Sequence, residues 1–216
     1  MVILRTPKRG HLVKLNFAFS GKLYQSSFDS DRMETDLQKI ALVKNAIGCY
    51  PDFPKPGILF RDIFGILSDV VATRALLDLL VDHTRSLAVD VIVGLDARGF
   101  ILGPLIAAEL SKPFVPVRKK GKLPGQVISQ SYKLEYGEDT LEVQRNNPST
   151  GKRVLIVDDL LATGVCDNVL GTMEAAIQLL KSADAGVIHC LVVMELTSLN
   201  GRAKLSAPVH SLLQFD

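Results

Sequence analysis

The 216-residue chain has no long apolar run, little net charge and few cysteines. No apolar segment approaches the roughly 18 residues that a membrane-spanning helix requires, so we expect no membrane association. The formal net charge of +2 at pH 7 predicts no nucleic-acid partner, because such a partner requires basic residues concentrated on one face. The three cysteines are far apart and form neither a disulfide framework nor a paired-cysteine metal motif. This pattern favours a reducing, cytoplasmic setting.

Two common phosphate-binding motifs are also missing. No GxGxxG follows a predicted strand. The Gly-Lys pairs that begin at Gly21, Gly121 and Gly151 lack both the earlier glycine and the following hydroxyl of a GxxxxGK[ST] loop. These absences disfavour the dinucleotide-binding proteins and the P-loop proteins.

The first 33 residues differ from the rest of the chain in charge. They carry six basic residues against two aspartates, and no acidic residue precedes Asp29. Such segments are typical of organelle-targeting leaders, and the alternative is a disordered extension with Met33 as a second start. We favour the disordered extension, because the arginines are few and no long amphipathic helix is evident. The predicted organisation is therefore an extension over residues 1–33 and one folded domain over residues 34–216.

Apolar periodicity in the folded domain predicts alternating helices and strands. Helices are expected over residues 34–48, 69–87 (capped by Ser68 or Asp69), 100–110 and 173–183, and strands over residues 89–95, 114–117, 154–157, 187–194 and 210–215. The prolines of YPDFPKPGILFRDI (50–63) exclude a regular helix and predict an ordered loop or hood. Residues 119–145 are polar with alternating apolar positions, which predicts a long hairpin or flexible lid. The predicted fold class is α/β, with a mainly parallel sheet flanked by helices.

The segment VLIVDDLLATG, residues 154–164, carries the strongest functional pattern. Four apolar strand residues precede Asp158 and Asp159, and small residues follow. Ligands of open parallel sheets bind beyond the carboxyl ends of the strands, where two carboxylates can accept hydrogen bonds from the vicinal hydroxyls of a sugar. Small residues at the start of a helix let backbone N–H groups approach a phosphate. A solvated strand end or a helix cap is the structural alternative for a bare aspartate pair.

With these segments identified, the chain resembles the adenine phosphoribosyltransferase family of type I phosphoribosyltransferases, from about Glu34 to Asp216. Six segments in the family's order support the resemblance: YPDFPKPGILFRDI (50–63), VGLDARGFILGP (93–104), VRKKGKLPG (117–125), SYKLEYG (131–137), VDDLLATG (157–164) and ELTSLNGRAKL (195–205). The resemblance implies transfer of a phosphoribosyl group from 5-phosphoribosyl 1-pyrophosphate to adenine, giving AMP and pyrophosphate. It also implies a homodimer and Mg²⁺ held mainly by the substrate, with no dedicated metal ligands in the protein.

The same resemblance implies roles for individual residues. Pyrophosphate would be bound by Asp96, Ala97, Arg98, Arg118, Lys119 and Lys122, in a region where the family often has a non-proline cis peptide. Ribose and its phosphate would be bound by Asp158, Asp159, Ala162, Thr163, Gly164, Gly171 and Thr172. Adenine would be bound by Leu59, Phe60, Arg61 and Leu160. The catalytic residues would be Arg98, Glu135, which exchanges a proton with adenine, and Tyr136, which closes over the reacting centre.

Structural alternatives remain for several of these positions. The basic residues of RKKGK can form a solvated loop, and Phe60 can be a core residue. The four histidines have no metal-ligand spacing, and His83 is expected to be structural or at the surface.

One segment departs from the family's pattern. The family continues ATG directly into GT, whereas here Val165 to Leu170 stand between Gly164 and Gly171. A helical insertion of six residues would rotate the following apolar stripe by about 240° and misplace Met173. An insertion that bulges outward would leave both glycines able to approach one phosphate. We expect the fold to survive and phosphate binding to weaken.

Two classes of function remain at this point. The leading one is an adenine-specific transferase, and the hood and the lid disfavour a hypoxanthine or orotate enzyme. The second is a non-catalytic protein that keeps the fold and nucleotide affinity, with the insertion as its support. A DNA-binding regulator is weaker still, because no helix-turn-helix domain precedes residue 34.

Overall fold

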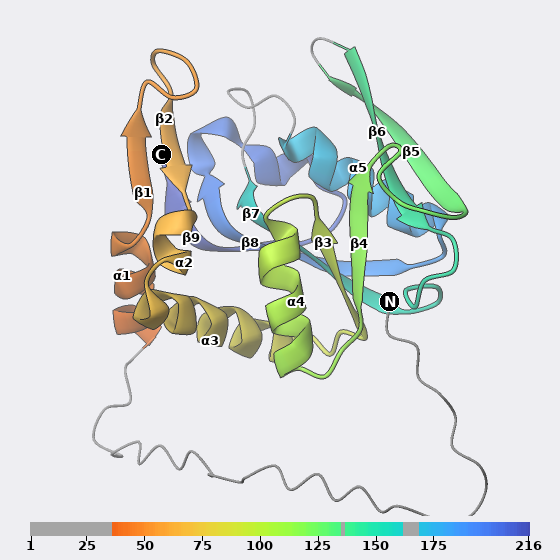
Figure 1. Cartoon of the computed structure of the whole chain (residues 1–216), viewed down its shortest axis with the longest axis horizontal. Helices are drawn as coiled ribbons and strands as arrows, with labels where there is room; N and C mark the ends of the chain where they lie inside the picture. Colours follow the sequence, from red (N-terminus) through yellow and green to blue (C-terminus); the bar gives the residue numbers. More distant parts are fainter. Residues whose placement is uncertain (1–35, 135–136, 162–168) are drawn as a thin grey trace, which may run out of the picture. The chain divides into compact units, whose positions relative to one another are not determined.

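The computed structural model describes residues 36–134, 137–161 and 169–216 (Figure 1). The helices are α1 (Asp36–Asn45), α2 (Phe64–Leu67), α3 (Val70–Ser86), α4 (Gly99–Glu109) and α5 (Val169–Ser182), with short 3-10 turns η1 (Thr197–Leu199) and η2 (Gly201–Lys204). The strands are β1 (Gly48–Pro51), β2 (Leu59–Asp62), β3 (Val91–Leu95), β4 (Phe114–Lys119), β5 (Val127–Leu134), β6 (Gly137–Gln144), β7 (Arg153–Leu161), β8 (Gly186–Leu196) and β9 (Val209–Phe215). Among the described helices, none has the length and apolar character needed to cross a membrane.

Seven strands form the central sheet, in the order β5-β6-β4-β3-β7-β8-β9. Neighbouring strands are parallel from β4 to β9. The β5–β6 hairpin is antiparallel and joins the sheet through an antiparallel β4–β6 pair. The predicted α/β class with a mainly parallel sheet is therefore confirmed, and residues 119–145 include a long hairpin.

The two faces of the sheet are buried by different helices. Successive side chains of a strand point to opposite faces, and β7 shows this clearly: Ile156 packs in the layer with α5, whereas Leu155 and Val157 pack in the layer with α1, α3 and α4. A strand covered on both faces needs apolar side chains at every position. This explains the continuous apolar run before the two aspartates.

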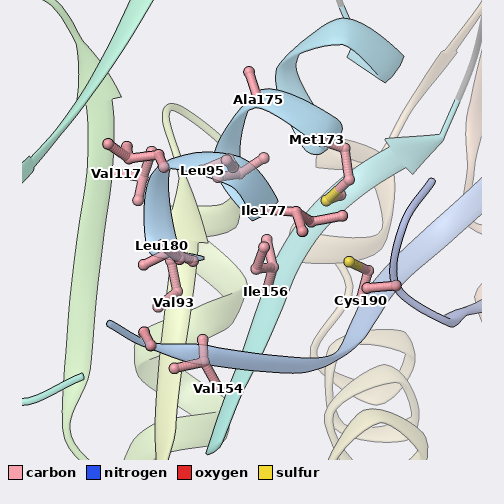
Figure 2. Packing of buried hydrophobic residues seen from close by; sticks show 14 of the residues in the cluster. Val93, Leu95, Val117, Val154, Ile156, Met173, Ala175, Ile177, Leu180 and Cys190 are labelled. Atoms are coloured by element: carbon pink, nitrogen blue, oxygen red, sulfur yellow. The ribbon is translucent and has the colours of Figure 1, made fainter. Parts of the chain in front are cut away.

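The apolar stripe of α5 faces the sheet despite the six-residue insertion before it. Met173, Ile177 and Leu180 are all fully buried (0% exposed). Figure 2 shows Ile177 between Ile156 and Cys190, with Met173 beside it. The expected misplacement of a helical insertion therefore does not occur, and the first half of our hypothesis, that the fold survives, is confirmed.

Local signals at α3 agree with the prediction. Asp69 is the N-cap, and its carboxylate accepts hydrogen bonds from the backbone N–H groups of Val71 (2.8 Å) and Ala72 (3.2 Å). Such a cap contributes about 1 kcal/mol. The helix then ends at Ser86, one residue before the predicted end.

The proline-rich segment differs from the prediction, because short strands flank its loop. β1 and β2 pair antiparallel, with Gly48 opposite Asp62 and Pro51 opposite Leu59. Proline is tolerated at a strand end or in a loop, although not inside a helix. The prolines therefore excluded a helix correctly but did not exclude strands. Whether this hairpin acts as a hood stays a prediction.

Three of the histidines, distant in sequence, lie together at α3, β8 and β9. The rings of His83 and His210 stack at 3.8 Å between centroids, and His189 lies 5.4 Å from His83. Burial, with the neighbouring His210 and His189, lowers the pKa of His83 to about 4. Burial also lowers the pKa values of His189 and His210. The cluster is therefore neutral near pH 7, in agreement with a structural role for His83.

Candidate functional site

The two aspartates lie where β7 extends beyond one of its neighbours. The β3–β7 ladder ends at the pair Gly94 and Val157, whereas β8 pairs with β7 as far as Leu161 and Glu195. Asp158 and Asp159 are therefore inside β7 but past the last pair that β7 forms with β3. The predicted strand end at Val157 is wrong, because the longer β8 continues to supply hydrogen-bond partners to β7.

The two aspartates differ in their surroundings: Asp158 is buried, whereas Asp159 is partly buried. Asp158 is 9% exposed, and its Oδ1 accepts the backbone N–H of Asp159 at 3.0 Å. Burial raises the pKa of Asp158 well above its usual range, and the charge of Asp159 adds to this rise. Burial also raises the pKa of Asp159, but Arg98 opposes it through an Nε–Oδ2 ion pair at 3.2 Å. Of the two, Asp158 therefore keeps a proton more readily, and the ion pair with Arg98 favours the ionised form of Asp159.

The loop between β3 and α4 brings predicted pyrophosphate residues together. The Asp96–Ala97 peptide is a non-proline cis bond, as the resemblance implied. Asp96 Oδ2 accepts a hydrogen bond from Arg118 Nε at 2.8 Å and lies 3.9 Å from Lys122 Nζ. Arg98 follows in the same loop and reaches Asp159. Cations from two separate segments thus meet at one edge of the sheet.

A buried carboxylate that the sequence analysis missed holds the basic loop after β4. Glu142 on β6 is 4% exposed, and its Oε2 accepts the backbone N–H of Gly121 at 2.9 Å. Gly121 has a φ of +79°, a left-handed conformation that favours glycine. Lys120 donates its backbone N–H to the Thr140 carbonyl at 2.9 Å. The loop backbone is therefore fixed by the hairpin, which argues against a freely solvated loop.

A second missed set of contacts joins the last residue of β4 to α5 through the β5–β6 hairpin. Lys119 Nζ lies 2.7 Å from Asp139 Oδ2, and the Tyr132 hydroxyl lies 3.3 Å from the same oxygen. The Tyr132 hydroxyl also lies 3.2 Å from Thr172 Oγ1. The hydrogen bond from Lys119 lowers the pKa of Asp139, and the same bond raises the pKa of Lys119. Tyr132 and Asp139 are cross-strand partners, so the register of the hairpin was the signal that could have revealed them.

The predicted adenine residues occupy two places. On the β1–β2 hairpin, Leu59 is exposed, and Phe60 is half-buried with its ring edge-to-face against Phe53 at 5.2 Å. The Arg61 guanidinium stacks on the Phe215 ring at 3.8 Å, which connects this hairpin to β9. Leu160, on β7, packs against the layer that contains α3 and α4. In the view of Figure 1, the β1–β2 and β5–β6 hairpins stand on either side of the carboxyl end of β7.

Several predicted residues lie outside the described residues: Glu135, Tyr136, Ala162, Thr163, Gly164 and the insertion as far as residue 168. The last two residues of the insertion begin α5, and Gly171 and Thr172 lie in its first turn. Thr172 is therefore beside the helix N-terminus, where backbone donors favour an anion.

Comparison with known families defines the class of protein. The phosphoribosyl transferase domain family matches residues 72–212, which include β3 to β8 and most of β9. The matched region contains the aspartate pair, the β3–α4 loop and the basic loop. The chain therefore belongs to the phosphoribosyltransferase family.

Individual relatives narrow this assignment. An adenine phosphoribosyltransferase of Drosophila pseudoobscura pseudoobscura is 52% identical over 179 residues, covering 82% of this chain and 96% of the relative. That of Mus musculus is 50% identical over 182 residues, covering 82% and 98%. The crystal structure of the Saccharomyces cerevisiae enzyme, complexed with adenine and an imino-altritol bisphosphate, is 41% identical with a TM-score of 0.74, covering 82% and 99%. Within its family, this chain is placed among the adenine phosphoribosyltransferases.

The packing of α4 against β7 gives a test of how the site is positioned. A Cβ added at Gly99 would lie 2.4 Å from the Val157 carbonyl oxygen, directly before the aspartate pair. Alanine gains up to about 1 kcal/mol of helix propensity over glycine, but overpacking costs about 1–3 kcal/mol and backbone cannot yield easily. We expect Gly99→Ala to lower the free energy of unfolding by about 1–2 kcal/mol in urea titrations.

The control for this variant is Gly186→Ala, because a Cβ there meets its nearest atom at an ordinary 3.5 Å. It should change the free energy of unfolding by less than about 0.5 kcal/mol. Equal stability of the two variants would contradict the close contact between α4 and β7.

Proposed function

We propose that this chain transfers a phosphoribosyl group from 5-phosphoribosyl 1-pyrophosphate to adenine, releasing AMP and pyrophosphate. The observation that carries the proposal is the Asp158–Asp159 pair near the end of β7, in which Asp158 is buried and Asp159 is ion-paired to Arg98, in a chain about half identical to adenine phosphoribosyltransferases. The two substrates are small molecules that differ in charge: one is a polyanionic sugar and the other is a neutral base. The acidic and basic side chains of the site suit the sugar.

The reaction requires the ribose to be held while pyrophosphate leaves. Asp158 and Asp159 would bind the two ribose hydroxyls, and the start of α5 with Gly171 and Thr172 would bind the 5-phosphate. As the C1–oxygen bond breaks, positive charge develops on the sugar and negative charge on the leaving group. Asp159, whose ionised form is favoured by Arg98, is suited to the first charge, since electrostatic stabilisation is usually the largest contribution in catalysis.

Cations around the β3–α4 loop would balance the leaving group. Arg98, Arg118 and Lys122 all contact carboxylates of this region. Arginine has five N–H donors and lysine has three, so each side chain has further donors for phosphate oxygens. The planar guanidinium groups bind phosphate in bidentate fashion, and the lysines act as point charges. This set supports the pyrophosphate roles that the sequence suggested.

Adenine would bind between the β1–β2 hairpin and the end of β7. Phe60 is half-buried beside Phe53 and outside both core layers, so its ring is suited to stacking on a base. Leu160 would contact the base from the sheet, and Leu59 and Arg61 would complete the hairpin wall. Glu135 would exchange a proton with adenine, and Tyr136 would close over the reacting centre.

Mg²⁺, a homodimer and a cytoplasmic location complete the proposal. The oxygen donors of the aspartate pair fit Mg²⁺ chemically, but Asp159 is ion-paired to Arg98, so the ion would arrive mainly on the phosphates of the substrate. When bound, it would neutralise charge on the leaving pyrophosphate. The homodimer rests on the family resemblance, and the location rests on the cysteine pattern.

Base specificity tests the proposed function. The chain should form AMP from adenine and 5-phosphoribosyl 1-pyrophosphate, and its kcat/KM for adenine should exceed that for hypoxanthine by at least about tenfold, because a site that hydrogen-bonds one base edge rejects a mismatched one. Product formation with adenine, hypoxanthine and orotate measures this. A stronger response to hypoxanthine than to adenine would refute the assignment.

The aspartate pair is tested by Asp159→Asn. We expect kcat/KM for the phosphoribosyl substrate to fall by about 10- to 100-fold, because hydrogen bonds to charged groups contribute about 1.5–3 kcal/mol. Asp90→Asn is the matched control, since Asp90 is also ion-paired to an arginine, Arg153, but at the opposite ends of β3 and β7. Its activity should stay within about twofold of wild type. Similar losses in both variants would remove the aspartate pair from the proposal.

The insertion is tested by deleting residues 165–170. We expect the deletion to raise kcat/KM for the phosphoribosyl substrate, because it restores the sequence ATGGT and removes both the β-branched Val165 and the acidic Asp167 from the phosphate-binding motif. An AMP-formation assay with and without the six residues measures this. Equal kcat/KM values would contradict a weakened phosphate site. A wild-type chain that binds AMP without turnover would instead support the non-catalytic alternative, which the identities to named enzymes do not favour.

A further inference from the structure

Tyr132, on β5, contacts one residue of β6 and one residue at the start of α5. Its hydroxyl lies 3.3 Å from Asp139 Oδ2, the oxygen that is 2.7 Å from Lys119 Nζ. The same hydroxyl lies 3.2 Å from Thr172 Oγ1, in the first turn of α5. The ring also lies over Gly171, where an added Cβ would meet Tyr132 Cδ2 at 3.4 Å. One half-buried side chain of β5 therefore connects the Lys119–Asp139 ion pair with the start of α5.

We infer that Tyr132 is a positioning residue for phosphoribosyl transfer: its hydroxyl orients the Thr172 hydroxyl toward the 5-phosphate of the substrate. The inference rests on the proposed function and adds a residue to which neither the motifs nor the family resemblance assigned a role. It also gives the β5–β6 hairpin a part in phosphate binding that is independent of any closing movement.

The direction of the hydrogen bonds supports this role. Tyr132 and Thr172 each have one hydroxyl proton. Asp139, whose pKa is lowered by Lys119, is ionised near neutral pH and can only accept. With Tyr132 donating to Asp139, the contact between the two hydroxyls is made by Thr172 donating to Tyr132. The contact therefore holds the Thr172 hydroxyl at a defined position before a phosphate arrives.

Phosphate binding reverses one of these bonds. A phosphate oxygen accepts a proton, so Thr172 turns its O–H to the phosphate and Tyr132 donates to the Thr172 oxygen instead. Asp139 gives up only its long contact with Tyr132, because it keeps the shorter ones from Lys119 (2.7 Å) and from the Thr140 backbone N–H (2.8 Å). A chain of two donating hydroxyls then ends on the phosphate, and each bond polarises the next.

The proposed role also requires that the Tyr132 hydroxyl stays protonated and keeps its position. Burial raises its pKa above the ordinary value, so the hydroxyl keeps its proton at neutral pH. The ring packs against the core layer that contains α5. The hydroxyl therefore remains beside Thr172 without a further loss of side-chain entropy.

The test compares ligands that differ only in the phosphate. Tyr132→Phe keeps the ring and removes the hydroxyl. We expect the Kd for AMP, measured by calorimetry on the full chain, to rise about three- to tenfold, the usual effect of one lost hydrogen bond. The Kd for adenosine should stay within about twofold. In steady-state assays, KM for 5-phosphoribosyl 1-pyrophosphate should rise with little change in KM for adenine.

Ser131→Ala is the matched control. Ser131 precedes Tyr132 on the same strand, and its hydroxyl contacts Thr140 Oγ1 at 3.1 Å on the exposed side of the hairpin. This variant loses one hairpin hydroxyl without touching α5, so it should leave the Kd for AMP unchanged. Equal effects of the two variants on AMP, or equal loss of AMP and adenosine in Tyr132→Phe, would overturn the inference.

A double variant separates positioning from general stability. Thr172→Val removes the hydroxyl that Tyr132 orients, so adding Tyr132→Phe in that background should weaken AMP binding by less than about twofold further. A full additional loss would mean that Tyr132 acts elsewhere, and would overturn the inference. Failure of the wild-type chain to make AMP from adenine would refute the proposed function, whereas the comparison of AMP with adenosine would still decide the role of Tyr132.

Discussion

The unequal pairing of β7 with its two neighbours is the constraint on which the site depends. β3 stops pairing at Val157, while β8 continues to Leu161. The two aspartates between these points keep a strand backbone on one side and have no β3 partner on the other. A strand backbone holds carboxylates more rigidly than a loop does, and rigid placement is what electrostatic stabilisation requires. The start of α4 then brings Arg98 to Asp159.

The position of α5 shows which free-energy contributions decide how a helix packs after an insertion in the sequence before it. Burial of a large apolar side chain contributes about 1.5–3 kcal/mol, and Met173, Ile177 and Leu180 are all buried against the sheet. Lengthening a loop costs only about 0.6 kcal/mol for each doubling. The stripe therefore sets the rotation of the helix despite the six extra residues in the sequence. This argument concerns the fold alone, because phosphate binding depends on backbone geometry that hydrophobic burial does not control.

The structural features that were predicted correctly from the sequence are those that one strong local interaction determines. The apolar run of β7, the Asp69 cap and the stripe of α5 each follow from burial or from a single hydrogen-bonding group. The end of β7 was misjudged because the length of a different strand, β8, decides it. Glu142, Tyr132 and Asp139 were missed because their partners depend on the register of the β5–β6 hairpin, and a shift of one residue would turn each side chain to the other face. Polar contacts that depend on register cannot be predicted from composition or periodicity.

The charged groups of the site are balanced before any substrate arrives. Clustered cations repel one another, yet three of those proposed to bind pyrophosphate are each within 3.2 Å of a carboxylate oxygen. These pairs are Arg98–Asp159, Arg118–Asp96 and Lys119–Asp139. The cations are a third to a half exposed, so each pair contributes little to stability and is readily rearranged. The acids therefore hold the cations in place at small cost, and an incoming polyanion meets donors that are already oriented.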